Sequence, residues 1–228
     1  MYSSEVIYHV YNQSINYETV FRSERNYRYF LKKVKRHLCP YADIFAFCLM
    51  PDHFHFLLKP NELGCQQSPS GRYRRKDEEP TEKAVYQQNL SHGLKVLLSS
   101  YTRALYKEVG RRGSLFKAGT EAKPGYENFY PDASALDAEK PFTLFIPYLK
   151  ICFFYIHDNP TKANLVTDPL EWEHSSALDY AGYRDSGICN FALTEQLLGI
   201  SRQPSVGDSS DRLVVGPLKS SDQFSKDD

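Results

Sequence analysis

Two β-rich segments separated by a short turn constrain the fold more than any other feature of the sequence. Residues 41–50 are apolar or aromatic except for Asp43, and residues 53–59 alternate histidine with phenylalanine before two leucines. Aromatic and β-branched residues favour strands, and Pro51-Asp52 is a typical turn dipeptide. Because the connection is so short, the two strands are expected to pair as an antiparallel hairpin.

The segment before this hairpin predicts one further strand and one helix. Residues 5–12 are rich in β-branched and aromatic side chains, which is typical of a strand. Ser23 can cap a helix, and apolar residues follow it at helical spacing. Pro40 is expected to end that helix, because the residue before a proline disfavours helical geometry.

The segments after the hairpin predict two longer helices. One covers about residues 82–109, with an apolar stripe along one side and Gly110 at its end. The other covers residues 143–158, and Asn159-Pro160 is expected to end it. The intervening residues 124–141 have the composition of a loop.

The order strand, helix, strand, strand, helix, with a last strand to follow, predicts an α+β protein. The layout is ferredoxin-like (RRM-like): an antiparallel sheet with helices packed on one face, which leaves the other face open for a ligand. We expect one domain over residues 1–185. Within it, residues 61–80 are rich in glycine, serine and charge and should form a flexible insert. Residues 186–228 should form a partly disordered C-terminal extension.

The composition excludes several classes of protein. Hydrophobic residues make up 41% of the 228 residues, enough for a core, yet no apolar run is long enough to cross a bilayer. The N-terminus has no basic region followed by an apolar stretch, so no secretory signal is expected. Five scattered cysteines without a CxxC pair favour a reducing compartment, and we expect a cytoplasmic protein without a membrane partner.

The sharpest chemical signal is a pair of histidines in the predicted third strand. Residues i and i+2 of a strand point to the same face, so His53 and His55 should project together while Phe54 and Phe56 face the core. Two neighbouring imidazoles form a ready site for a divalent metal ion. The alternative is a pair of half-buried histidines that bind nothing.

A second signal lies in the last predicted helix. Tyr155 and Asn159 are four residues apart and share one helix face, so a hydroxyl and an amide would point to one place. A tyrosine with an ordinary pKa of about 10 needs help to act as a nucleophile, and a metal ion that polarises the electrophile provides it. The alternatives are a packed aromatic at Tyr155 and a helix-ending amide at Asn159.

In their order and spacing these segments resemble a known family. Pro51-Asp52-His53-Phe54-His55 is similar to the HUH box of the insertion-sequence transposases that use a single tyrosine. Tyr155-Ile156-His157-Asp158-Asn159-Pro160 is similar to the box that carries the nucleophile, especially in the branch associated with repetitive extragenic palindromes. The flanking segments Tyr8–Asn12, Gly113–Phe116, Lys162–Val166 and Trp172–Ser176 resemble further elements of the family, so the resemblance covers about residues 5–182.

The resemblance implies a DNA transposase, an enzyme that cleaves and rejoins single-stranded or hairpin DNA. Tyr155 would be the nucleophile, leaving a 5′-phosphotyrosine and a free 3′-hydroxyl. His53, His55 and Asn159 would bind a divalent cation, Mg²⁺ or Mn²⁺, and no nucleotide cofactor would be needed. Relatives include dimers and monomers. The resemblance therefore leaves open whether the protein is a homodimer. It also leaves open whether Tyr155 meets the histidines of its own chain or those of a partner chain.

Basic residues near the end of the predicted long helix are candidates for DNA contact. They are Arg103, Lys107, Arg111, Arg112 and, a little further on, Lys117. The stretch 70–123 holds twelve basic and six acidic residues, although the chain as a whole has no net charge. After Gly113–Phe116 the family usually continues with a basic-aromatic pair, whereas Lys117-Ala118 stands here.

Two further functions are compatible with the same residues. One is a catalytically inactive or domesticated module of this fold that binds single-stranded nucleic acid, as RRM-like sheets do through stacked aromatics. The other is a zinc hydrolase built on His53 and His55, which would need a further His, Asp or Glu cluster. Covalent trapping of DNA on Tyr155 distinguishes the transposase from both.

Overall fold

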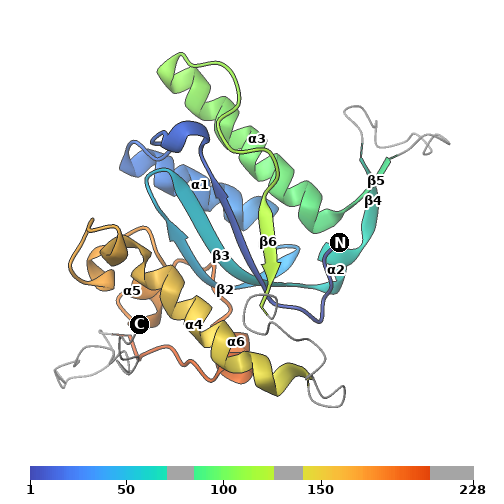
Figure 1. Cartoon of the computed structure of the whole chain (residues 1–228), viewed down its shortest axis with the longest axis vertical. Helices are drawn as coiled ribbons and strands as arrows, with labels where there is room; N and C mark the ends of the chain where they lie inside the picture. Colours follow the sequence, from blue (N-terminus) through green and yellow to red (C-terminus); the bar gives the residue numbers. More distant parts are fainter. Residues whose placement is uncertain (71–84, 126–140, 206–228) are drawn as a thin grey trace, which may run out of the picture.

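A four-stranded antiparallel sheet with the strand order β2-β3-β1-β6 forms the centre of the protein (Figure 1). The computed structural model describes residues 1–70, 85–125 and 141–205. The strands of the sheet are β1 (Tyr8–Gln13), β2 (Ala42–Leu49), β3 (His53–Pro60) and β6 (Glu121–Pro124). The predicted hairpin of β2 and β3 is confirmed, and so is the ferredoxin-like α+β class, because the first strand lies between the third and the last.

One face of the sheet carries the two helices expected there. They are α1 (Glu24–His37) and α3 (Asn89–Val109), and Gly110 ends α3 in a left-handed conformation with φ of 68°. Phe54 and Phe56 of β3 point into this layer and are fully buried, as the alternation predicts. Complete burial of a phenylalanine side chain stabilises a fold by about 1.5–3 kcal/mol, so this face anchors the sheet.

The opposite face is not left open, which corrects the expectation from sequence. It carries α4 (Pro141–Lys162) and the shorter α6 (Phe191–Leu198) (Figure 1). Phe45 and Leu57 of the sheet pack there against Phe153 and other apolar residues of α4. The reason lies in β2, whose side chains are apolar on both faces, so that exposure of either face would leave apolar area in water.

Helix α4 also extends further than predicted. It runs through Pro160 to Lys162 instead of ending before the proline. Pro160 lies in the last turn, where the missing N–H costs the helix a single main-chain bond. Asn164, with φ of 56°, then turns the chain away.

Residues 61–80 are not simply the flexible insert that was expected. The helix α2 (Glu62–Cys65) and the strand β4 (Gln67–Ser70) follow β3 directly, and β4 pairs with β5 (Val85–Gln88). Helix α3 therefore begins at Asn89, later than the predicted start at 82, because residues 85–88 join this ribbon. The rest of the proposed insert, including the basic run 72–76, lies outside the described residues.

The chain continues to pack on the sheet beyond residue 185. Ile188 joins the core under α1, and Leu198 is buried under α4. The main chain of Cys189 pairs with that of Ile44 in β2 as an isolated parallel β-bridge. The first part of the proposed C-terminal extension is thus built into the fold. The short helices η3 (Pro169–Glu171) and α5 (Ala177–Tyr180) connect α4 to it. Most of the predicted loop 124–141 and residues 206–228 lie outside the described residues.

Candidate active site

His53 and His55 project from the same face of β3, as the spacing predicts. Their ring centroids are 5.0 Å apart and the rings are perpendicular. His55 is buried with 6% of its surface exposed, whereas the His53 side chain keeps 23% exposed. The pair therefore forms a site that is closed on the side of the sheet and accessible at His53.

Tyr155 lies beside this pair, although it comes from the far end of the chain. Helix α4 crosses the same sheet face and places the Tyr155 ring 5.9 Å from the His55 ring, in an edge-to-face arrangement. The tyrosine remains 40% exposed, so its hydroxyl is not sealed in the core. The structure thus brings the tyrosine and the histidines together within one chain.

Asn159 lies one turn after Tyr155 on the same helix face. Its amide nitrogen donates a hydrogen bond to the main-chain oxygen of Tyr155 at 2.8 Å, and the residue is 9% exposed. This bond fixes the side chain against its own helix and uses the nitrogen, which leaves the amide oxygen as the atom suited to a cation.

Two neighbours of the histidines were missed by the sequence analysis. Asp52 Oδ1 lies 2.5 Å from His53 Nδ1, and His9 Nε2 lies 2.8 Å from His55 Nδ1. Asp52 could have been found from its place in the turn next to His53. His9 could not, because only the pairing of β1 with β3 brings it to His55.

The environment keeps the inner histidines uncharged. Burial lowers the pKa of His55 to about 2, with the neighbouring His9 and His53 adding to the effect. Burial, followed by the charge of Lys123, lowers the pKa of His9 to about 4. A neutral imidazole has a free lone pair, which is the form that binds metal ions.

A basic residue also lies over the candidate nucleophile. The Nζ atom of Lys162 is 4.7 Å from the centre of the Tyr155 ring, and the same ammonium lies 3.9 Å from Asp158. All three side chains belong to the last two turns of α4. The tyrosine thus sits between a cation on the helix and the histidines on the sheet.

His53 and His55 offer two imidazoles with 5.0 Å between ring centroids, and Asn159 offers an amide oxygen one turn after Tyr155, a donor set without formal charge. Over residues 1–70, 85–125 and 141–205, no three His, Cys, Asp or Glu side chains come close enough to hold a metal ion. The further acidic or histidine ligand that a zinc hydrolase would need is therefore not found in the described part of the chain.

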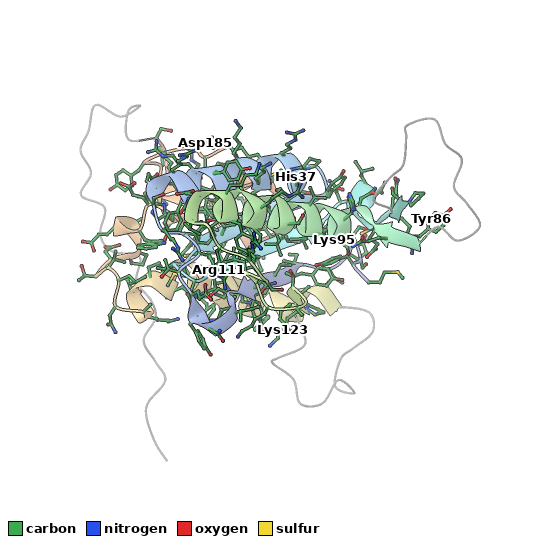
Figure 2. All side chains as sticks on the ribbon, turned by 90° about the horizontal axis from the view of Figure 1, so that it is seen from above. His37, Tyr86, Lys95, Arg111, Lys123 and Asp185 are labelled. Atoms are coloured by element: carbon green, nitrogen blue, oxygen red, sulfur yellow. The ribbon has the colours of Figure 1, made fainter. Side chains whose placement is uncertain are left out.

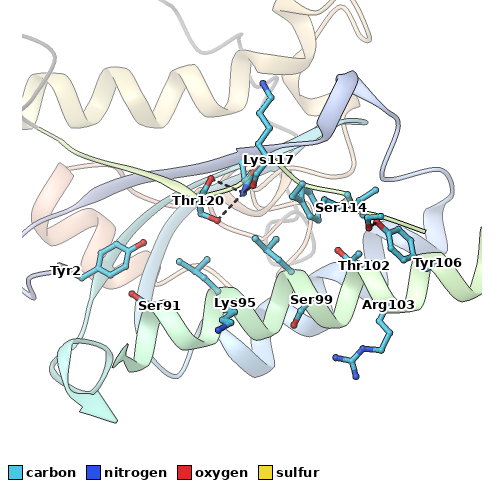
Figure 3. A pocket seen from close by; sticks show the side chains of 17 residues that line it. Tyr2, Ser91, Lys95, Ser99, Thr102, Arg103, Tyr106, Ser114, Lys117 and Thr120 are labelled. Carbon is cyan, nitrogen blue, oxygen red and sulfur yellow. Dashed lines mark hydrogen bonds between the residues drawn. The ribbon is translucent and has the colours of Figure 1, made fainter. Parts of the chain in front are cut away.

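The candidate DNA-binding residues divide into two groups. Arg103 and Lys117 line a cavity of about 930 Å³ between α3 and residues 113–120, together with Lys95. Figure 3 shows Ser91, Lys95, Ser99, Thr102 and Arg103 along its α3 side, with Ser114, Lys117 and Thr120 opposite. The Lys117 side chain points away from the cavity, and its ammonium donates to Gln13 Oε1 at 2.7 Å. Among the described residues, no acidic side chain lines the cavity. We call this cavity the α3 groove.

The remaining three candidates lie at the end of α3. Lys107 and Arg112 are exposed there. Arg111, labelled in Figure 2, is already engaged. Its guanidinium pairs with Glu18 at 2.6 Å and lies over the Tyr106 ring. Arg111 therefore holds the segment after α3 in place, and its charge is partly compensated.

The α3 groove and the histidine–tyrosine site lie on opposite faces of the sheet. Asn12 of β1 lines the groove, whereas its neighbour Tyr11 contacts the His55 ring at 5.7 Å between centroids. The Asn12 amide donates to Thr120 Oγ1 at 3.1 Å and so holds the groove wall to the strand. Strand β1 thus contributes neighbouring residues to the α3 groove and to the histidine–tyrosine site.

Two other histidines have structural surroundings. His157 points away from Tyr155, as expected, and its Nε2 lies 2.7 Å from Ser176 Oγ in the core. His174 stacks on Tyr27 with 3.5 Å between ring centroids. Trp172, also predicted to be a packing residue, donates a hydrogen bond to the main-chain oxygen of Leu49 at 3.0 Å.

The fold and this site define an α+β protein of the ferredoxin-like kind with a tyrosine and a histidine cluster on one sheet face. No protein-family model matches the chain, and no curated protein matches it. The chain is similar to a solved structure described as a REP-associated tyrosine transposase bound to a REP hairpin. Identity is 15%, the alignment covers 94% of this chain and 96% of that chain, and the TM-score is 0.48.

Over the described ranges, none of the helices is both long and apolar enough to cross a membrane. The longest apolar helix, α4, carries His157, Asp158 and Lys162 in its last turns.

Proposed function

We propose that this protein is a DNA transposase that cleaves and rejoins single-stranded DNA through Tyr155. The observation that carries the proposal is the meeting of Tyr155 on α4 with His55 on β3, at 5.9 Å between ring centroids. The two residues lie far apart in sequence, and each belongs to a box that resembles this family. A packed core aromatic would be buried, whereas Tyr155 is 40% exposed.

In the proposed reaction the Tyr155 hydroxyl oxygen attacks a DNA phosphorus. A bond forms between that oxygen and phosphorus while the bond from phosphorus to the 3′ oxygen breaks. The 3′ oxygen leaves as a hydroxyl, which takes up a proton as the phenol loses one. The 5′ end stays on the protein as a phosphotyrosine. Attack by another 3′-hydroxyl reverses these steps and joins two strands, so no nucleotide cofactor is required.

His53, His55 and Asn159 are proposed to hold the cation, Mg²⁺ or Mn²⁺. When bound, such an ion acts as a Lewis acid that neutralises phosphate charge. The chain supports this role by keeping His55 neutral through burial. The mobility of the Asn159 side chain is restricted by its hydrogen bond to the Tyr155 carbonyl, so the nucleophile and the proposed third ligand move as one unit.

The DNA outside the reacting site is proposed to lie along the basic end of α3. Arg103 in the α3 groove, and Lys107 and Arg112 beyond it, are exposed cations suited to phosphates. Lys117 is exposed as well, with its ammonium on Gln13 of β1. Arg111 contributes by holding this segment through Glu18. Because the whole chain has no net charge, this local surplus must supply the electrostatic attraction.

The second candidate function is a binding module that holds hairpin DNA without cutting it. The position of the α3 groove favours it, because the groove lies on the sheet face away from Tyr155 and does not need the histidines. The RRM-like mode with stacked strand aromatics is not available to Phe54 and Phe56, which are fully buried. Binding without covalent trapping would identify this function.

The test is a covalent-trapping assay. Labelled single-stranded hairpin DNAs are incubated with the protein and Mn²⁺, and the products are separated on a denaturing gel. We expect a labelled protein band with the wild type, and none with Tyr155→Phe or His53→Ala. Tyr183→Phe is the matched control, because it removes the same hydroxyl from another exposed tyrosine.

The outcomes separate the two functions. A band that persists in Tyr155→Phe would place the nucleophile elsewhere. DNA retention by the wild type on a native gel, with no covalent band for any hairpin in the pool, would support the binding module. A Mn²⁺-dependent band that Tyr155→Phe alone abolishes would support the tyrosine and leave the ligand role of His53 contradicted.

A further inference from the structure

Each histidine of the pair is held through the same ring atom, but by a different kind of neighbour. The Nδ1 atom of His53 lies 2.5 Å from a carboxylate oxygen of Asp52. The Nδ1 atom of His55 lies 2.8 Å from the Nε2 atom of His9. Since Nδ1 is engaged in both rings, Nε2 is the atom that each ring has left for a ligand.

The contact between His9 and His55 fixes the positions of two protons. Only one hydrogen can lie between the two nitrogens, and a neutral imidazole carries one N–H and one lone pair. If His55 is to offer a lone pair on Nε2, its Nδ1 must carry the proton and donate it. His9 must then accept through Nε2 and carry its own proton on Nδ1.

We propose that His9 is a positioning residue that sets the tautomer and orientation of His55. It accepts the Nδ1 proton of His55 and thereby leaves the Nε2 lone pair of His55 free for a ligand. The role in metal binding rests on the proposed function, and so does the direction of this hydrogen bond, because the contact alone allows either nitrogen to donate.

The surroundings of His9 support a fixed arrangement. The two imidazole rings meet edge to edge through these nitrogens, with 5.0 Å between centroids and 24° between planes, because β1 and β3 pair side by side. Tyr11 on the same strand covers the His9 ring at 5.1 Å, and Tyr155 lies at its edge at 6.1 Å. Burial lowers the pKa of both histidines, which keeps the pair neutral.

The difference between Asp52 and His9 gives the two rings different characters. A carboxylate partner makes the imidazole of His53 a stronger electron donor, and this is the common partner of metal-bound histidines. A neutral imidazole partner orients His55 without adding charge next to the buried sheet.

The first experiment measures Mn²⁺ binding by calorimetry in the full chain without DNA. His9→Phe keeps a ring but removes the acceptor, and we expect affinity to fall by about 10–100-fold, the usual effect of losing such a partner. His9→Gln restores an acceptor and should recover most of the affinity. His92→Phe is the control, because it makes the same substitution at a histidine that is exposed on α3, and it should bind as the wild type does.

The second experiment uses no metal. Long-range ¹H–¹⁵N NMR spectra of the histidine rings report which nitrogen carries the proton. We expect His55 to be protonated on Nδ1 in the wild type and in His9→Gln. In His9→Phe the proton should leave Nδ1, either wholly or in part, since the acceptor is gone.

Two results would overturn the inference. One is a wild-type His55 with its proton on Nε2. The other is equal Mn²⁺ affinity in His9→Phe and the wild type, or equal loss in His9→Phe and His9→Gln, which would indicate packing alone. Failure of the proposed function looks different: wild type and His53→Ala would bind Mn²⁺ equally, while the tautomer of His55 would still respond to His9.

Discussion

The two faces of the sheet have the same backbone and opposite chemistry. On the face under α1 and α3, the side chains of β3 are Phe54, Phe56 and Leu58, and all three are fully buried. On the face under α4, the same strand presents His53 and His55 before Leu57 begins a second apolar cluster. One face is therefore uniform, and the other is apolar at one end and polar at the other.

This difference shows how a small sheet places its main apolar core on one face and its candidate reactive side chains on the other. Strand alternation sends every second residue to the face under α1 and α3, called the closed face below. The histidines therefore do not have to contribute to the main core. Helix α4 then covers only the apolar end of the second face with Phe153 and Ile156. Tyr155, which lies between these two residues in the sequence, points to the polar end and reaches His55 there.

The largest expected effect comes from breaking the closed face. Phe54→Ala should lower the free energy of unfolding by about 3–5 kcal/mol, because it leaves a cavity among fully buried aromatics. Urea denaturation followed by the fluorescence of Trp172 measures this. Phe154→Ala is the control from the partly exposed side of α4, where the side chain is 41% exposed, and it should cost less than about 1 kcal/mol. Equal costs would mean that the closed face is not the main source of stability.

The sequence predicts the face under α1 and α3 well and the face under α4 poorly, for physical reasons. Alternation within β3 is local, so the burial of Phe54 and the shared direction of the histidines follow from spacing alone. The cover by α4 depends on a contact between residues far apart in the sequence, because Phe45 of β2 is buried only when α4 packs over it. The spacing of apolar residues within β2 does not reveal that contact. His9 reaches His55 only through the pairing of β1 with β3, and local patterns do not specify that register.

The boundaries of α4 and of the insert teach the same lesson. Pro160 is a correct local stop signal, but a proline in a final turn removes only one bond and packing overrides it. Residues 85–88 have no strong helix-breaking signal, yet they pair with β4 and delay α3. For the site itself, the contact of Tyr155 with the histidines was expected from the family resemblance, and the residues alone left it open.

The face under α4 should also be the source of acid sensitivity. Burial lowers the pKa of His157 to about 3, whereas an unfolded histidine has a pKa of about 6.5. Above pH 6.5 His157 is mainly neutral in both the folded and the unfolded state, so its contribution to the free energy of unfolding no longer changes with pH. Between about pH 6.5 and 3 the unfolded state binds one more proton, so this group lowers the free energy of unfolding by about 1.4 kcal/mol per pH unit as the pH falls.

His157→Gln in metal-free buffer tests this. Glutamine can keep the contact with Ser176, and the variant should lose less stability than the wild type between pH 6 and 4. Urea titrations at several pH values give the slope. His92→Gln is the matched control, because His92 is exposed on α3 and meets similar surroundings in both states. An unchanged slope in His157→Gln would mean that this histidine does not titrate with unfolding.

The smallest effect should come from the α3 groove, because phosphate contacts act additively and weaken with salt. The double variant Lys95→Ala/Arg103→Ala removes two cations of α3 that line it, while Lys117, whose ammonium donates to Gln13 next to Asp52, and the histidine–tyrosine face stay intact. The slope of log affinity for hairpin DNA against log salt should become shallower by about 2. Covalent trapping at saturating DNA should persist, since Tyr155 lies on the other face.

The contrast with Arg36→Ala/Lys35→Ala sharpens this result. These two cations are exposed on α1, outside the groove, so the same change in net charge should leave the salt slope nearly unchanged. Fluorescence anisotropy with one labelled hairpin at several salt concentrations measures all three proteins. If both double variants flatten the slope equally, the α3 groove is not a DNA path and bulk charge alone attracts the DNA. If the groove variant also loses trapping at saturation, the two faces are not functionally separate.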